Sequence, residues 1–218
     1  MRKISLIGLA TMSMLAFNTS AFALGAASSN SDASGKHWSV VGAATLVQPK
    51  NGKNAAQNTV KFGGDVAPTL SVTYYINDNV GFELWGITKK LSYTAKTDAS
   101  GKIGNVTQKT PLALSAQYHF GQAQNVFRPF VGVGYSQAKS RFTALGSTDR
   151  VNLGNFRGAI GTIGLDMNVD SNWFARLDAR YTRFSNSNSK AALSSSLGLD
   201  QNRRLDPWSV GFGIGARF

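Results

Sequence analysis

Ionisable residues recur at alternate positions in the second half of the chain. Arg176, Asp178 and Arg180 occupy every second position, and a β-strand puts such side chains on one face. Further ionisable residues lie in other strand-like segments, on the strand face that we expect to point into the fold: Glu83, His119, Arg128, Asp166 and Arg217. Opposite charges are tolerated inside a protein when they pair and hydrogen-bond. We therefore predict that these residues form one buried ionic cluster, which would plug the interior of the fold.

The same residues offer little for catalysis or metal binding. The chain has no cysteine and only two histidines, His37 and His119. A zinc site would need further ligands, and a serine–histidine–acid set would need a serine near His119, which the spacing does not mark out. We expect no enzyme activity, no metal and no cofactor. A proton or ion path through the cluster is the alternative to a structural plug.

The elements that would position this cluster are β-strands, and the segment 206–218 shows this most clearly. From position 208 on, its even positions, Trp208 to Phe218, are apolar or aromatic, whereas its odd positions are serine, glycine and Arg217. An apolar outer face with aromatic residues at both ends is typical of a strand in an outer-membrane barrel. Such a sheet must close on itself, because lipid offers no hydrogen-bond partner to an open edge.

Seven further segments share this strand character. With the last one, the predicted strands are 37–48, 66–76, 80–91, 110–120, 126–140, 154–168, 172–184 and 206–218. The links between them alternate between short (77–79, 121–125, 168–172) and long and polar (49–65, 91–109, 141–153, 185–205). The sequence therefore predicts an all-β protein, an eight-stranded antiparallel transmembrane β-barrel over 37–218, with short periplasmic turns and long extracellular loops.

The N-terminal residues predict export. Arg2 and Lys3 precede a mostly apolar stretch, and Ala21-Phe22-Ala23 is a small-x-small cleavage site, so we expect residues 1–23 to be a signal peptide cleaved near Ala23. Residues 24–36 are small and polar, as in a flexible periplasmic tail. The formal charge of +12 would suit nucleic acid, but export to a Gram-negative outer membrane favours lipid and lipopolysaccharide phosphates as partners and excludes nucleic acid.

An eight-stranded barrel has room for its own side chains or for one small ligand. The inward positions that we expect nearer the long loops are apolar: Val41, Val47, Trp85, Ile87, Ala113, Phe130, Ile160 and Phe184. An apolar lumen above a charged plug would hold a small hydrophobic molecule and bar its way to the periplasm. Sideways release is then expected at a seam weakened by Pro49, Pro68 and Pro111, because proline removes a ladder donor. Prolines that only end strands are the alternative.

Several stretches, in order along the chain, resemble the OmpW family of outer-membrane proteins. They are Trp38 with Gly42 and Pro49, then 74–84 (YYINDNVGFEL), 117–120 (QYHF), 128–134 (RPFVGVG), 164–166 (GLD) and 206–218. The resemblance implies an eight-stranded barrel with an apolar channel that passes small hydrophobic compounds and opens laterally. It also implies that Phe218 is read by the β-barrel assembly machinery.

These observations predict a narrow, porin-like apolar channel for the uptake of small hydrophobic molecules, with lateral release into the membrane. The alternative is a structural or adhesive outer-membrane barrel that acts through its loops without transport. An apolar upper lumen favours transport, whereas a lumen filled from side to side favours the structural role.

Overall fold

The computed structural model describes residues 33–53, 59–98, 101–146, 150–185 and 206–218, and within them every regular element is a strand. Eight long strands form the barrel: β1 (Trp38–Gln48), β4 (Asp65–Tyr75), β5 (Val80–Ile87), β7 (Gly101–His119), β8 (Phe127–Ala144), β9 (Arg150–Asn168), β10 (Trp173–Phe184) and β11 (Trp208–Arg217). Three short strands add to one rim: β2 (Gly52–Lys53), β3 (Thr59–Phe62) and β6 (Leu91–Thr97). No helix in these ranges is long and apolar enough to cross a membrane.

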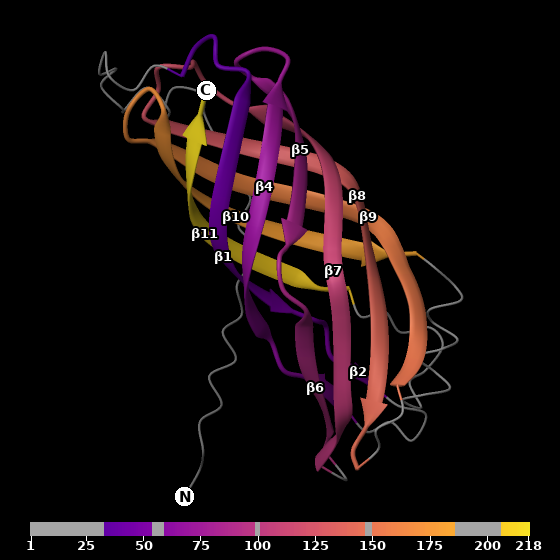
Figure 1. The fold of residues 1–218 in the computed structure, drawn as a ribbon. Coiled ribbons are helices and arrows are strands. Elements are labelled where there is room, and N and C mark those ends of the chain that lie inside the picture. The colour runs from indigo at the N-terminus through magenta and orange to yellow at the C-terminus, as the bar shows by residue number, and fades with distance from the viewer. Residues whose placement is uncertain (1–32, 54–58, 99–100, 147–149, 186–205) are drawn as a thin grey trace, which may run out of the picture.

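The sheet closes on itself, as predicted. β1 pairs antiparallel with β4 on one side and with β11 on the other, and the pairing of β7 with β8 completes the ring (Figure 1). At the junction of the two chain ends, the backbones of Trp38 and Phe218 exchange hydrogen bonds of 2.9 and 3.0 Å. No barrel strand is therefore left with an open edge in the membrane, which is what lipid requires.

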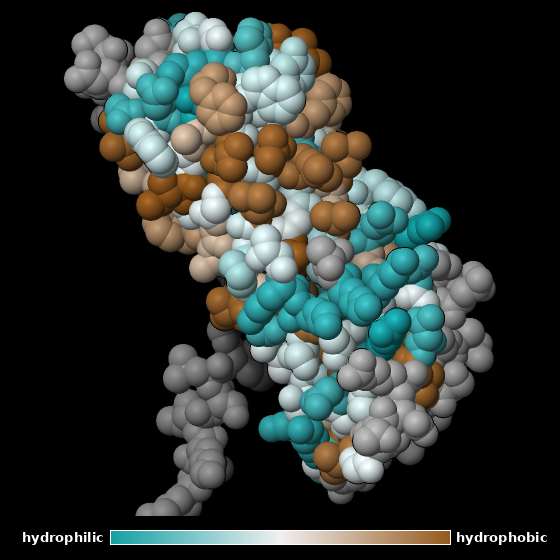
Figure 2. Space-filling view, viewed as in Figure 1, coloured by the Kyte–Doolittle hydropathy of each residue, from teal (hydrophilic) through white to brown (hydrophobic). Residues whose placement is uncertain are grey.

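The predicted inward and outward faces are confirmed. Val133, Phe212 and Ile214 are 72%, 62% and 60% exposed, whereas their neighbours Gly132, Gly213 and Gly215 face inward. On the face that Figure 2 shows, apolar side chains form a brown band across the barrel, with hydrophilic side chains above and below it. A closed sheet with an apolar belt and a polar inside suits lipid as its surroundings.

The barrel extends further beyond the membrane than the sequence analysis expected. We predicted a polar loop over 91–109, but it holds β6 and the first half of β7. A strand of 19 residues such as β7 is about twice as long as the roughly 9–11 residues that a tilted strand needs to cross the hydrocarbon layer. β7, β8 and β9 therefore project past the end of β5 (Figure 1), and we call this part of the barrel, together with β2, β3 and β6, the extension. The prediction was wrong because the outward residues of this extension face water and are polar, so the segment reads as a loop.

The short turns are fixed by side chains that accept backbone hydrogen bonds. Asn77 accepts from the amides of Asn79 and Val80 at 2.9 and 2.8 Å. Asp170 accepts from the amides of Asn172 and Trp173, both at 2.7 Å, and these bonds lower the pKa of its carboxyl. Such turns set where the neighbouring strands begin, and so how high each inward side chain lies in the barrel.

The N-terminal residues 33–36 contact two of these turns. The Ala33 amide donates to the Ala123 carbonyl at 3.2 Å. The Ser34 hydroxyl and the Gly35 amide both donate to the Asp78 carboxylate at 3.3 Å. This part of the expected tail therefore lies against the short-turn end of the barrel, whereas residues 24–32 and the expected signal peptide lie outside the described residues.

Candidate functional site: the barrel interior

The predicted ionic cluster exists, and Arg176 is at its centre. Its guanidinium donates to both carboxylate oxygens of Asp166, at 2.7 and 2.9 Å, and to Glu83 at 3.1 Å. Glu83 in turn accepts two bonds from Arg180, at 2.6 and 3.2 Å, and Arg180 reaches Asp178 at 2.8 Å. Strands β5, β9 and β10 are thus joined by charge-assisted hydrogen bonds, which are stronger than neutral ones.

The last strand and the short-turn end join the same network. Arg217 donates to Asp166 at 3.1 Å and to the side-chain oxygen of Asn168 at 2.5 Å. The His119 ring nitrogen Nδ1 lies 3.6 Å from Asp166. Arg128 donates to the backbone carbonyl of Asp78 in the first short turn. All eight predicted residues therefore lie together, and we call them the charged plug.

Aromatic rings fill the space around the plug. The Phe130 ring stacks on His119 with 4.8 Å between centroids, and the Arg176 guanidinium lies 4.6 Å from the centre of the same ring. Arg217 lies 3.8 Å from the centre of the Phe174 ring. Glu83 and Asp166 have no exposed surface. These two carboxylates are therefore shielded from bulk solvent, and the pairing of the plug charges offsets this loss of bulk water.

Two residues predicted for the apolar upper lumen lie instead beside the plug. Phe130 contacts the plug directly, as described above. Val41 pairs with Gly215, where an added Cβ would come within 2.3 Å of the Phe174 ring and 2.8 Å of Val41 itself. Both predictions of height were wrong because these residues are close to the short-turn starts of β8 and β1. Their inward direction was predicted correctly.

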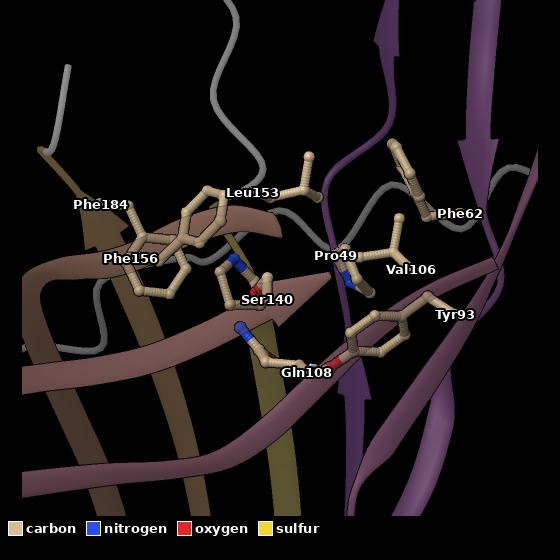
Figure 3. A pocket seen from close by; sticks show the side chains of 10 residues that line it. Pro49, Phe62, Tyr93, Val106, Gln108, Ser140, Leu153, Phe156 and Phe184 are labelled. Carbon is tan, nitrogen blue, oxygen red and sulfur yellow. Dashed lines mark hydrogen bonds between the residues drawn. The ribbon is translucent and has the colours of Figure 1, made fainter. Parts of the chain in front are cut away.

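Above the plug the interior is mostly apolar and contains two cavities. The lower one has about 360 Å³ of empty space, and its walls include Val47, Trp85, Ile87, Ile160 and Phe184, as predicted. The upper one, of about 400 Å³, lies in the extension (Figure 3). Both cavities touch Gln108, Phe184 and Pro207, so they are neighbours along the barrel. We call this pair of cavities the upper lumen.

Most residues in the walls of the upper cavity were not predicted from the sequence. They come largely from β3, β6, β7 and β9: Phe62, Tyr93, Val106, Leu153 and Phe156. All five are buried. The alternation of Leu91, Tyr93 and Ala95 with polar residues could have indicated these walls. Such a pattern is typical of a strand with one buried face and one face in water.

The three predicted seam prolines differ in their surroundings. Pro49 follows the end of β1 and lines the upper cavity. Pro68 lies on the outer surface of β4, and its carbonyl accepts the Thr88 amide just beyond β5. Pro111 lines the lower cavity at an irregularity in the β7–β8 ladder.

Pro68 and Pro111 flank the outer end of β5. The β4–β5 ladder ends at Thr69 and Ile87, next to Pro68. The β5–β7 ladder ends at Gly86 and Leu112, next to Pro111. β5 is also the shortest of the eight barrel strands, with 8 residues. Since proline cannot donate to a ladder, Pro68 and Pro111 each remove one possible backbone hydrogen bond at this end of β5.

A closed eight-stranded sheet with an apolar outer belt and paired charges inside defines an outer-membrane β-barrel protein. The described residues contain no group of three or more histidine, cysteine or acidic side chains placed to hold a metal ion. The chain belongs to the OmpW family, whose family model matches residues 35–218.

Relatives and solved structures agree with this membership. Outer membrane protein W of Escherichia coli (strain K12) is 31% identical over 160 residues, which cover 68% of this chain and 71% of the relative. The crystal structure of OprG from Pseudomonas aeruginosa matches with a TM-score of 0.63 at 18% identity, covering 87% of this chain and 99% of that one. The NMR structure of outer membrane protein W from E. coli gives a TM-score of 0.54 at 23% identity, covering 84% and 98%. The two structures share the barrel fold.

Proposed function

We propose that this barrel takes small hydrophobic molecules from outside the cell and releases them sideways into the outer membrane. The observation that carries the proposal is the division of the interior at Trp85. Below this residue the interior holds the charged plug, and above it lies the apolar upper lumen.

The upper lumen has the properties of a site for a small apolar ligand. Its two cavities hold about 360 and 400 Å³ of space that protein atoms do not fill, open solvent included. None of the described residues that line them is charged. An apolar molecule gains roughly 25 cal/mol per Å² of surface that it removes from water there.

The charged plug opposes passage toward the short-turn end. A molecule moving past Arg176 would have to separate buried ion pairs and offers no group to replace them. The outer end of β5 is the easier exit, because Ile87 and Pro111 line the lower cavity while both ladders of β5 stop beside them. The release step thus leads from the lower cavity into lipid between β5 and β7.

The surface of the extension supports contact with lipopolysaccharide. Exposed lysines lie on its strands and loops: Lys61, Lys89, Lys90, Lys96, Lys102 and Lys139. On the face shown in Figure 2, hydrophilic side chains gather on this part of the molecule. Basic residues at an anionic membrane surface are attracted to its phosphates. We therefore place the entrance of the proposed path among lipid headgroups, and the proposed role needs neither a catalytic group nor a cofactor.

Uptake into cells tests the proposal. Strains without the protein, with the wild type, and with Ile160→Trp or Ile163→Trp are given a labelled hydrophobic compound. Ile160 is buried in the lower cavity, whereas Ile163 is on the outer face of the same strand. We expect Ile160→Trp to lower uptake to the level of the deletion strain and Ile163→Trp to match the wild type. Equal uptake by all four strains contradicts transport and favours a structural or adhesive role.

A further inference from the structure

Gln108 is the one amide side chain among the described residues that line the upper lumen. It lines both cavities and is therefore at their junction. It is 8% exposed, so its polar group is almost fully enclosed. A buried amide in an apolar cavity is costly unless each of its hydrogen-bonding groups finds a partner.

A β-bulge directs Gln108 into the lumen. Along the membrane part of β7 the inward residues are odd-numbered, such as Ala113 and Ser115, but in the extension they are even-numbered, such as Val106 and Gln108. The β7–β8 register shifts between Lys109 and Leu112, and the extra residue there reverses the alternation. Without this bulge Gln108 would face outward, so its position inside is built into the strand.

One side of the Gln108 amide is already engaged. The Tyr93 hydroxyl lies 3.4 Å from the carbonyl oxygen of Gln108 and donates to it. Burial, and secondly the charge of Asp65, raises the pKa of Tyr93, so its hydroxyl keeps its proton. Figure 3 shows Gln108 with the Tyr93 hydroxyl directed at it and with Ser140 beside it. The Nε2 group of Gln108 is left to donate to another acceptor.

The other polar groups on the cavity walls are less selective. Within the described lining they are the hydroxyls of Tyr93, Ser136, Ser140, Thr182 and Ser209 and the indole of Trp85, which carries a single N–H donor. A hydroxyl can rotate to suit a nearby acceptor, whereas the amide of Gln108 presents two hydrogens in a fixed plane. The position of Gln108 therefore defines where a ligand acceptor would be bound.

The chemistry of the walls excludes an ionised ligand. A carboxylate would lose its water without meeting a cation, because Arg180 below Trp85 already donates through Nε, Nη1 and Nη2 to Asp178 and Glu83. A plain hydrocarbon is disfavoured for a different reason. It would shield the Gln108 amide from water and offer it no hydrogen-bond partner. An apolar molecule with one uncharged oxygen acceptor avoids both costs.

We propose that the upper lumen selects uncharged apolar molecules with one oxygen acceptor, such as a ketone, ester or alcohol, and that Gln108 donates a hydrogen bond to that oxygen. This inference rests on the proposed function and adds the class of ligand to it. A difference of about tenfold in affinity over the matching hydrocarbon, or ~1.4 kcal/mol, is expected for one such bond.

The experiment compares 2-octanone with octane. The wild type, Gln108→Leu and Gln122→Leu are placed in phospholipid nanodiscs, because detergent would itself fill an apolar lumen. Gln122 is exposed at a short turn, so its variant is the matched control. Binding at equal ligand concentrations in the membrane is followed through the NMR signals of the isoleucine methyl groups of Ile87 and Ile160, which line the lower cavity.

The proposal expects the wild type and Gln122→Leu to bind 2-octanone about tenfold more tightly than octane, and Gln108→Leu to bind both alike. Equal affinities in the wild type overturn the role of Gln108 but leave the proposed function standing. Binding of neither compound overturns the proposed function as well. The wild-type comparison decides the matter even where Gln108→Leu fails to fold.

Discussion

The guanidinium carbon of Arg180 lies 4.8 Å from the centre of the Trp85 ring. Below this contact, Arg180 is held by Glu83 and Asp178; beside it, Trp85 lines the lower cavity. A cation over an aromatic face is a favourable contact, and it lets an apolar wall rest directly on a charged layer. This pair therefore marks the boundary between the charged plug and the upper lumen.

The plug should be essential to stability. Arg180→Glu places a like charge against Glu83 and leaves buried charge unpaired, so we expect a loss of about 3–5 kcal/mol of unfolding free energy. Thermal unfolding of the purified barrel measures it. Arg183→Glu, on the exposed face of the same strand, is the control and should differ little from the wild type. Equal unfolding of the two variants would show that the plug charges are not dry.

Blocking the floor of the upper lumen should stop uptake. Trp85→Arg replaces an apolar wall with a charge and brings it next to Arg180. We expect cells that carry this variant to take up a hydrophobic compound no faster than cells without the protein. The amount of folded barrel in the outer membrane, measured by gel mobility without boiling, must match the wild type for the comparison to count. Normal uptake by a folded Trp85→Arg barrel would contradict the proposed path.

The sideways exit can be tested with cysteine pairs, since the chain has no native cysteine. Gly86 and Leu112 are the last partners of the β5–β7 ladder, and Val80 and Tyr118 are partners at its other end. A disulfide between residues 86 and 112 should lower uptake until a reductant is added. The disulfide between residues 80 and 118 is the matched control and should have no effect. Uptake that is unchanged by either disulfide would exclude an exit between β5 and β7.

Phe218 should matter for closure and assembly. Its backbone exchanges two hydrogen bonds with Trp38, and its side chain is 63% exposed on the lipid-facing side. Deletion of Phe218 should reduce the amount of barrel that reaches the outer membrane, both because these bonds are lost and because the assembly machinery is expected to read this residue. Normal insertion of the shortened chain would contradict that role.

The direction of each plug residue could be predicted from the sequence, but its partners could not. Alternation along β10 put Arg176 and Arg180 on one face. Their shared partner Glu83 is 93 residues from Arg176, and the closure of the whole ring decides which strands face each other across the lumen. The face of Phe130 was likewise predictable, whereas its height depends on where β8 begins after its short turn.

The upper cavity and Gln108 could not be predicted for a related reason. In the membrane, outward residues are apolar and inward ones are small or polar, so the pattern is easy to recognise. In the extension the outward residues face water and are polar, whereas the inward residues are apolar, so the pattern is reversed. The bulge near Lys109 then shifts the alternation by one residue, so the inward set changes from odd to even numbers along one strand.

The central claim is that an apolar molecule occupies the upper lumen above Trp85 and is barred from the region below. A crystal structure of the protein with a brominated alkyl ketone tests it most directly, because the anomalous signal of bromine locates the ligand without interpretation of weak density. The account predicts a bromine peak among the walls of the upper lumen, between Trp85 and Phe62. A peak among Asp166, Arg176 and Arg217, or bromine bound only on the outer face of the barrel, would contradict it.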